Sequence, residues 1–324
     1  MYNNSERCEK CTRFVFYNLE NLFDTHHDSL KSDMDFTPEG KNHWTYSHYL
    51  HKISNVYKTF LAMGGWEPPE LIGVAEIENE AVLKKLIYDT PLKKFRYGYI
   101  HYESPDARGV DVALLYRKEH FKVIKSSPIG IIMLQDTGFK TRDILYVKGT
   151  LGNCDTLHLF INHWPSSYGG FMNSKPRRDF VAGVLRKKVD SLLSVNPLAN
   201  ILIAGDLNDE YTDESITLHL NANDDTTGNS TNLVDMMAFM TPDKIGSHKY
   251  AGRWRNIDQI IVSLSLYKGK SKLKISGGKA HIFSPEFLLE EDKLGKKPYR
   301  TFLGPRYIGG FSDHLPVYTD IICK

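Results

Sequence analysis

Short groups of polar side chains follow or adjoin apolar runs at six places in the chain, and their types suit phosphate chemistry. Burying such groups without partners would cost about 2–7 kcal/mol each, so we expect them at the rim of a sheet or around a common ligand. Carboxylate and amide oxygens are ligands that Mg²⁺ prefers, and imidazoles can donate to anionic oxygens. The groups are Asn18-Leu19-Glu20, Glu76, Asn162-His163, Asp206-Leu207-Asn208, Asp258 and Asp313-His314.

Each group alone also has a plain structural interpretation. Asn18 to Glu20 could be a turn, Glu76 could precede a helix, and Asp313-His314 could lie in a surface turn. Together, however, they are the parts that metal-assisted phosphate hydrolysis requires. The i, i+2 spacing of Asp206 and Asn208 also puts both side chains on one side of an extended segment.

The elements that must position these groups are short apolar strands alternating with helical patterns. Helices are predicted at 50–63, 80–89 and 173–193, and polar surface loops at 221–232 and 290–298. Strands interleaved with helices favour one layered α/β domain, and hairpin-like strands in its middle favour mixed or antiparallel sheets. The predicted strands are 13–18, 70–78, 97–102, 110–116, 121–133, 143–151, 157–164, 201–206, 257–263 and 314–322.

Length, composition and charge are those of a soluble globular protein with a large core. The chain has 324 residues, 41% of them hydrophobic and 25% charged, so no disulfide or metal is needed for folding. The net charge of +2 argues against a wide basic face for nucleic acid, although not against a local basic groove. No apolar run approaches the roughly 20 residues that span a bilayer, and no signal peptide is visible. We expect a cytoplasmic protein or, if a signal peptide was removed, a secreted or periplasmic one.

Cys8 and Cys11 form a C-x-x-C pair, and the other cysteines are Cys154 and Cys323. A zinc site would need a second pair of ligands at suitable spacing. Only His26 and His27 lie in range, and adjacent histidines have poor ligand geometry. The pair is therefore interpreted as part of a frayed N-terminal tail, residues 1–12, rather than as a metal or redox site.

Seven motifs, in order, carry a resemblance to a known family: YNLEN, GVAEIEN, RGVDVALLY, INHWPS, GDLND, RNIDQIIVS and SDHLP. They run from residue 17 to residue 318, nearly the whole chain. The chain resembles the endonuclease/exonuclease/phosphatase superfamily, and looks closest to its bacterial hydrolase members. The resemblance implies an α/β (α+β) fold: a four-layer α/β/β/α sandwich of two mixed β-sheets flanked by helices, in a single domain over residues 13–324.

The resemblance also implies a metal site. Glu76 matches the family's main metal-binding glutamate, and Asn18 matches an asparagine near the metal and the phosphate. Glu20 stands where many members have an aspartate, and would support the metal's ligands or bind the metal through water. Asp313 matches the metal-side aspartate of the last motif. The implied cation is Mg²⁺, with Mn²⁺ or Ca²⁺ as substitutes.

Five further residues match the family's catalytic positions. Asp206 and Asn208 match the pair that positions and activates the attacking water. His163 matches a histidine that contacts the phosphate in some branches, and Asp258 with His314 matches an Asp–His pair. The resemblance implies that this pair lies within hydrogen-bond distance. There, a carboxylate beside an imidazole favours the charged imidazolium.

Substrate contacts are assigned to Asn18, Asn162 and Arg108, the last with a surface arginine as the alternative. Arg177 and Arg178 are interpreted as surface residues of the third helix rather than as groove residues. The implied activity is Mg²⁺-dependent hydrolysis of phosphate esters, foremost as a phosphodiesterase or nuclease, with nucleic acid as one candidate substrate.

Three alternatives stay open. One is a phosphomonoesterase of inositol phosphates or nucleotides, and another is a lipid phosphodiesterase. The third, a non-catalytic scaffold, would have lost ligands, whereas every motif residue is present here. The sequence does not name the substrate, and we expect a monomer.

Overall fold

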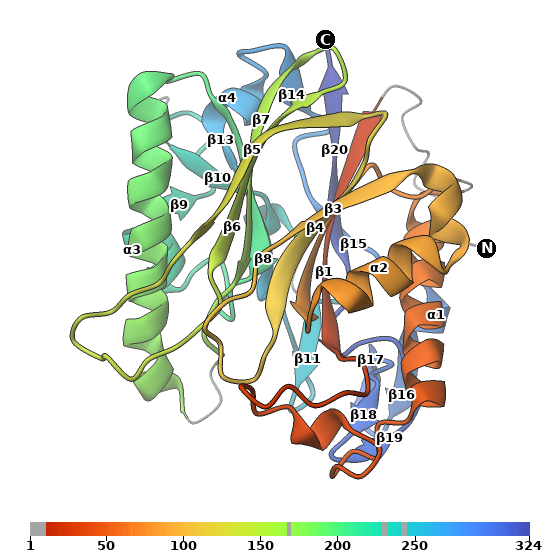
Figure 1. Cartoon of the computed structure of the whole chain (residues 1–324). Coiled ribbons are helices and arrows are strands. Elements are labelled where there is room, and N and C mark those ends of the chain that lie inside the picture. The colour runs from red at the N-terminus through yellow and green to blue at the C-terminus, as the bar shows by residue number, and fades with distance from the viewer. Residues whose placement is uncertain (1–10, 66, 167–169, 229–231, 241–244) are drawn as a thin grey trace.

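The structure, a computed structural model, describes residues 11–65, 67–166, 170–228, 232–240 and 245–324. Two seven-stranded sheets face each other, and helices lie against their outer faces (Figure 1). The predicted class, a sandwich of two mixed sheets, is confirmed. No helix in these described ranges is long and apolar enough to cross a membrane.

The first sheet contains both ends of the described chain. Its order is β14-β20-β1-β2-β4-β3, and β15 also pairs with β20. Strands β1 and β2 are parallel, and their other neighbours are antiparallel. The strands are β1 (Cys11–Leu22), β2 (Leu71–Ile77), β3 (Tyr97–His101), β4 (Asp111–Arg117), β14 (Leu273–Ile275), β15 (His281–Ile282) and β20 (Val317–Cys323).

The second sheet has the order β5-β6-β7-β8-β13-β10-β9. It is also mixed, because β7 and β8 are parallel while β13 runs antiparallel to β8. Its strands are β5 (Phe121–Ile129), β6 (Ile144–Leu151), β7 (Asp155–His163), β8 (Asn200–Asp206), β9 (Ala222–Asn223), β10 (Leu233–Asp235) and β13 (Asp258–Ser263).

Helices α1 and α2 cover the first sheet and α3 covers the second (Figure 1). The Thr45 and Asn79 side chains cap α1 and α2 by accepting a backbone N–H of the first turn. The helices are α1 (Tyr46–Met63), α2 (Glu80–Tyr88), α3 (Phe171–Val195) and α4 (Leu264–Lys268). Three short hairpins lie outside the sheets: β11 (His248–Tyr250) with β12 (Arg253–Arg255), β16 (Leu289–Asp292) with β17 (Gly295–Pro298), and β18 (Phe302–Leu303) with β19 (Arg306–Tyr307).

Three hydrophobic clusters fill the three interfaces of a four-layer molecule. One lies between the sheets, one between the first sheet and α1 and α2, and one between the second sheet and α3. Strand β1 shows how the sequence builds this. Phe14 and Phe16 face the inter-sheet cluster, while Val15 and Tyr17 face the helices. Alternate side chains of a strand point to opposite faces, and both faces here are apolar, so the strand reads as a continuous apolar run.

Several sequence-based boundaries need correction: β5 ends at Ile129 rather than at residue 133, β20 begins at Val317 rather than at residue 314, and the loop predicted at 221–232 contains β9. Strand β1 begins at Cys11, which pairs with Ile322, so Cys11 and Thr12 belong to the sheet rather than to a tail; Cys8 lies outside the described residues. Segment 290–298 is a hairpin of β16 and β17 rather than a loop. Cross-strand ion pairs of Lys297 with Glu290 and Asp292 explain why such a charged segment pairs.

A disulfide between Cys154 and Cys323 was not anticipated from the sequence. Cys154 lies in the turn between β6 and β7, and Cys323 ends β20. The bond therefore connects the two sheets at the end of the sandwich where the C-terminus lies, which is the end opposite β11 (Figure 1).

Candidate active site

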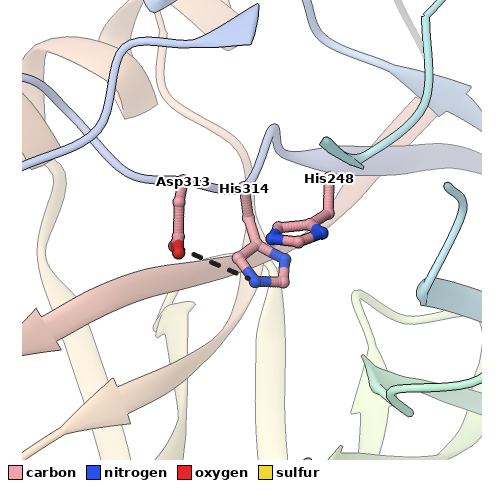
Figure 2. A group of neighbouring side chains, drawn as sticks. All are labelled: His248, Asp313 and His314. Carbon is pink, nitrogen blue, oxygen red and sulfur yellow. Dashed lines mark ion pairs between the residues drawn. The ribbon is translucent and has the colours of Figure 1, made fainter. Parts of the chain in front are cut away.

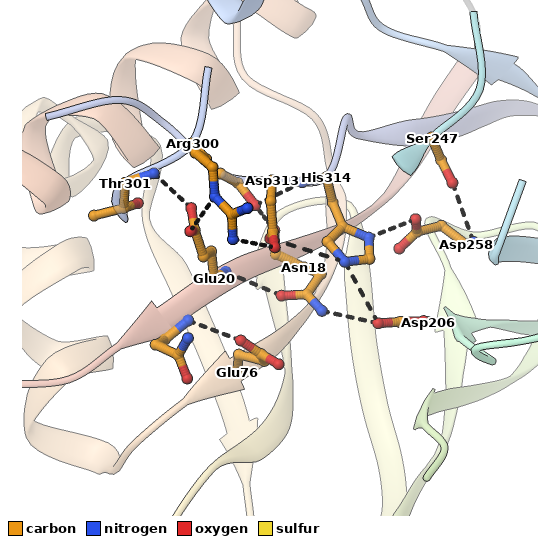
Figure 3. A network of polar contacts seen from close by, with 12 residues as sticks. Asn18, Glu20, Glu76, Asp206, Ser247, Asp258, Arg300, Thr301, Asp313 and His314 are labelled. Carbon is orange, nitrogen blue, oxygen red and sulfur yellow. Dashed lines mark hydrogen bonds and ion pairs between the residues drawn. The ribbon is translucent and has the colours of Figure 1, made fainter. Parts of the chain in front are cut away.

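Strand ends from both sheets meet at one end of the sandwich and bring the predicted polar groups together (Figure 3). In the first sheet, Asn18 pairs with Ala75, the neighbour of Glu76. In the second, Asp206 pairs with His163 on one side and with Asp258 on the other. Because β1, β2, β7 and β8 all end here, their last residues converge on the facing loop that carries Asp313 and His314.

Asp206 lies at the centre of the site. Its Oδ2 accepts a hydrogen bond from Asn18 Nδ2 at 3.0 Å and lies 3.7 Å from Nε2 of both His163 and His314. Its Oδ1 accepts the backbone N–H of Asn208 at 3.0 Å. Burial raises the pKa of Asp206 to about 7, an effect that Asp258 and Glu76 strengthen and His314 opposes. A carboxylate poised near neutral pH can serve as a general base.

His314 and Asp258 form the predicted pair. The His314 Nδ1 lies 2.7 Å from Asp258 Oδ2, and Asp258 donates its backbone N–H to Ser247 Oγ at 3.2 Å. Burial alone would lower the pKa of His314, but the charges of Asp258 and Asp206 outweigh it and hold that pKa well above its usual value. The imidazole is therefore cationic at neutral pH, with Nε2 directed toward Asp206.

His163 is in the opposite state. Its Nε2 lies 3.7 Å from both Glu76 Oε1 and Asp206 Oδ2. Burial, together with the cationic Arg142 and Arg108, holds its pKa well below the usual value, so the ring is neutral. Arg142 also fixes this strand end by donating to the carbonyl oxygen of His163 at 3.2 Å.

Left-handed backbone conformations cluster at the site. Glu20, Asn21, Glu76 and Asn208 have φ values of 48°, 56°, 60° and 55°. Each costs of the order of 1 kcal/mol or more in a residue with a side chain. At Asn208, the turn lets Nδ2 donate to the Trp164 carbonyl at 3.0 Å. Glu20, Asn21 and Glu76 lie in the last residues of β1 and β2, and Asn208 lies in the turn after β8, so these turns direct the polar side chains toward one another.

Glu76, Asn18 and Asp313 supply the oxygens that fit a hard divalent cation. Glu76 Oε2 accepts the Asn21 N–H at 2.9 Å, while Oε1 accepts no hydrogen bond from the described part of the chain. The Asp313 side chain is 25% exposed. Carboxylate and amide oxygens are the donors that Mg²⁺ takes, usually with several waters.

In the described chain, some acidic and histidine side chains lie close enough together to share a metal ion, but these groups cover only part of the site. They include Asp206, Asp258 and His314, and also His248, Asp313 and His314, each with atoms within 4.8 Å of one another. Glu76 belongs to neither group. A cation on Glu76 would therefore complete its coordination with water, as small hard cations do.

Glu20 has a supporting position. Its Oε2 accepts the Thr301 N–H at 2.6 Å and its Oε1 accepts the Phe302 N–H at 3.5 Å. Burial and the nearby Asp313 raise its pKa to about 7, while Lys52 and Arg300 oppose the rise. Because both oxygens already accept backbone hydrogen bonds, Glu20 anchors residues 301–302, and its expected link to a metal is indirect.

Two predicted substrate contacts are placed differently. Arg108 is 47% exposed on its side chain and its Nη1 lies 3.8 Å from Glu76 Oε1, so it stands at the rim of the site. Asn162 is fully buried: Nδ2 donates to the carbonyls of Phe160 and Ala204, and Oδ1 accepts from Trp164 Nε1. The structure therefore does not bring Asn162 to the site; it supports the strand end.

Arg178 corrects the interpretation of α3. Its side chain is fully buried, and its Nε donates to Asp209 Oδ2 at 2.7 Å. Arg177, by contrast, is 42% exposed and pairs with Asp136, as expected of a surface arginine. The sequence pattern does not distinguish these two adjacent arginines. They differ in the structure because Arg178 contacts Asp209 in the loop after β8.

Three basic residues at the site were missed by the sequence analysis. The His248 ring lies 4.8 Å from the His314 ring, centroid to centroid (Figure 2). Arg300 lies between Glu20 and Asp313 (Figure 3). Lys52 is fully buried on α1 beneath residues 301 and 311. None of them adjoins an apolar run in the sequence, and none is in the seven motifs.

Comparison with known proteins gives the family. A family model described as Endonuclease/Exonuclease/phosphatase family matches residues 13–322. No protein with a curated description matches the chain.

Solved structures show the same fold at low identity. D. rerio TDP2 complexed with a single-strand DNA product is 15% identical, with a TM-score of 0.57 over 96% of this chain and 98% of that one. The human Nocturnin catalytic domain with bound sulfate is 14% identical, with a TM-score of 0.54 over 97% and 95%. A family protein from Bacteroides thetaiotaomicron is 14% identical, with a TM-score of 0.57 over 96% and 95%. Since the family model covers nearly the whole chain and the fold agrees, the chain belongs to the endonuclease/exonuclease/phosphatase family of divalent-metal-dependent phosphoester hydrolases.

Proposed function

We propose that this hydrolase acts on phosphodiesters, with Asp206 as the base that activates water and His314 as the cation that stabilises the transferring phosphoryl group. The observation that carries the proposal is the continuous contact from Asp258 through His314 to Asp206. It places a carboxylate with a pKa of about 7 beside a protonated imidazole. Phosphoryl transfer needs little more from protein groups than positioning and charge stabilisation.

The chain's own residues supply the proton and charge steps. Water attacks phosphorus, its proton passes to Asp206, and the ester P–O bond on the far side breaks, so that the leaving alcohol departs as an alkoxide and takes its proton from solvent water. Asn208, fixed by Trp164 O, orients the water. Protonated His314 donates Nε2–H to a non-bridging oxygen, and Asn18 holds Asp206 in place through its Nδ2.

Glu76, Asn18 and Asp313 would hold Mg²⁺, or Mn²⁺ or Ca²⁺ in its place. Bound there, the cation supplies Lewis-acid neutralisation of the phosphoryl oxygens. The open Glu76 Oε1 and the partly exposed Asp313 carboxylate are the observations that support this assignment.

Nucleic acid is the substrate class we favour among phosphodiesters. A structural relative, D. rerio TDP2, is seen with a single-strand DNA product. The exposed Arg108 at the rim supplies a cation for a neighbouring phosphate. The formal charge of +2 is compatible with a local contact of this kind rather than with wide nonspecific binding.

A substrate panel with matched variants tests the proposal. Purified protein with Mg²⁺ is offered single-stranded DNA, RNA, plasmid DNA, bis-p-nitrophenyl phosphate, p-nitrophenyl phosphate, sphingomyelin and inositol phosphates. We expect diester cleavage that chelator abolishes and that Glu76→Gln lowers about 100-fold or more. Glu80→Gln, an exposed glutamate of α2, is the control and should stay near wild type. Undiminished turnover in excess chelator, or cleavage of monoesters alone, would refute the proposal.

A further inference from the structure

The backbone around Arg300 is fixed on both sides. Toward β1, Thr301 donates its N–H to Glu20 Oε2 at 2.6 Å. Toward the loop before His314, Gly310 donates to the Arg300 carbonyl at 3.1 Å and Phe311 to the Tyr299 carbonyl at 2.6 Å. The segment is thus held between two elements that both carry site residues, and the position of its side chain is set before any ligand arrives.

Buried Lys52 strengthens this arrangement. Its Nζ donates to the Phe311 carbonyl at 2.5 Å and to Thr301 Oγ1. A lysine without solvent exposure remains charged only beside acidic partners, and Glu20 lies close enough to supply that charge. Lys52 and Glu20 both hold Thr301, whose Oγ1 accepts from Lys52 and whose N–H donates to Glu20.

The Arg300 guanidinium has donors to spare. Its Nη2 donates to Asp313 Oδ2 at 3.2 Å, and its Nε faces Glu20 Oε1 at 3.4 Å, too poorly placed for a hydrogen bond. A guanidinium has five N–H donors, and Arg300 makes one hydrogen bond to the described chain. The side chain is 38% exposed although Nε is buried, so the donors open to a ligand are the terminal N–H groups of Nη1 and Nη2 that Asp313 does not take.

The position of Arg300 relative to His314 indicates which kind of ligand these donors would bind. The two oxygens of Asp313 are shared: Oδ2 accepts from Arg300, and Oδ1 lies 3.9 Å from His314 Nε2 (Figure 3). Two cationic groups therefore flank one carboxylate at the mouth of the site. A role as the counter-ion of Glu20 explains this poorly, because both Glu20 oxygens already accept backbone N–H groups.

We propose that Arg300 binds the non-bridging oxygens of the substrate's phosphoryl group, beside His314. A planar guanidinium matches two phosphate oxygens at once, which an ammonium cannot do. The inference rests on the proposed function, since it assumes that a phosphate ester occupies the same site.

Inorganic phosphate is the probe, because its binding is measured without turnover. Isothermal titration in excess Mg²⁺ compares the wild type with Arg300→Ala, Arg300→Lys and the control Arg186→Ala, an α3 arginine paired with Asp190. We expect the phosphate Kd to rise about 10-fold or more in Arg300→Ala, to rise less in Arg300→Lys, and to stay unchanged in the control. Inhibition of bis-p-nitrophenyl phosphate hydrolysis by phosphate should weaken in the same order, and millimolar guanidinium should restore part of the Arg300→Ala rate.

A purely structural role predicts different readouts. Arg300→Ala would then melt at a lower temperature but bind phosphate with the wild-type Kd, and guanidinium would not restore activity. That result, or a wild type that binds no phosphate, overturns the inference. If Arg300→Ala does not fold, Arg300→Lys decides in its place, because the point charge it keeps cannot make the paired contact. Failure of the proposed function looks different: no diester is cleaved, while the phosphate titration still ranks the variants.

Discussion

At the scale of single residues, the site holds two buried groups that the proposed reaction requires in different protonation states. Asp206, with a pKa raised to about 7 by burial, must lose its proton to act as a base. His314, with a pKa held well above its usual value against burial by Asp258 and Asp206, must keep its proton. Activity should therefore rise as pH passes about 7 and fall only when His314 deprotonates, which gives a bell-shaped profile.

The Asp258–His314 bond provides the first prediction. Asp258→Asn removes the charge that raises the His314 pKa, so that pKa falls and the alkaline limb of kcat/KM moves to lower pH. His314→Ala should lose most of the rate while Mg²⁺ binding, measured by titration, stays near wild type. A double-mutant cycle decides whether the residues act together. Additive effects with both single variants near wild type would mean that they share no task.

Asp235 carries the second prediction, and it concerns stability alone. The residue is fully buried at the end of β10, and its Oδ1 accepts the Met237 N–H while Oδ2 has no partner in the described chain. Burial raises its pKa to about 7 despite backbone hydrogen bonds from Met237 and Ala238. The folded state therefore holds a proton that the unfolded state releases near pH 4, so its contribution to stability falls as pH rises from about 4 to 7.

Asp235→Asn keeps the backbone hydrogen bond and removes this ionisation. Relative to wild type, the variant should gain stability on the order of 2 kcal/mol between pH 5 and pH 8, measured by urea unfolding at each pH. Asp224→Asn changes an exposed carboxylate in the loop between β9 and β10; it is the control and should track wild type. A constant difference at all pH values would show that Asp235 is ionised throughout.

At the scale of elements, Arg178 connects α3 to the loops that carry the site. It donates to Asp209 after β8 and to the Pro165 carbonyl after β7. Removing one partner of a buried pair leaves an uncompensated charge, so Arg178→Met should lower the unfolding free energy by about 3–5 kcal/mol. Arg177→Met removes an exposed partner of Asp136 and should cost less than about 1 kcal/mol. Equal losses in chemical denaturation would contradict the buried role of Arg178.

Much of the element order could be predicted, because many strands are buried on both faces and therefore appear in the sequence as long apolar runs. The pattern at 13–18 and the family motifs placed Asn18, Glu76 and Asp206 at strand ends, and the structure brings them to one edge. Segment 290–298 could not be predicted as a hairpin, since its pairing depends on charges opposite one another across strands.

The missed part of the site has a physical reason. Arg300, Lys52 and His248 reach it from a loop, a helix and a hairpin, each positioned by contacts far away in sequence. Spacing along the chain carries no record of such contacts. Asn162 shows the reverse error: it stands beside His163 in a motif, yet its amide turns into the sheet to bond Ala204.

At the scale of the whole molecule, the two sheets are linked in different ways at their two ends. At the site end, polar contacts cross between them, as in the hydrogen bond from Asn18 to Asp206. At the other end, Cys154 and Cys323 join the turn after β6 to the last strand. Between these ends the inter-sheet cluster is apolar. Such a disulfide persists in an oxidising compartment, which fits the secreted or periplasmic alternative.

The disulfide carries the last prediction. It closes a span of 169 residues, and cross-linking so long a loop restricts the unfolded chain, which stabilises the folded one by about 3–5 kcal/mol. Cys154→Ser/Cys323→Ser should lose about that much in urea unfolding. Its kcat/KM should stay near wild type, because the bond lies at the far end of β7, which ends at His163, and at the far end of β20, which follows the loop of His314. Reductant should lower the stability of wild type and leave the double variant unchanged.

Because one inter-sheet core connects the layers, circular dichroism and fluorescence should report one coincident transition in both proteins. Two separated transitions in the variant would show that the sheets unfold independently, and that the single-domain prediction over residues 13–324 is wrong.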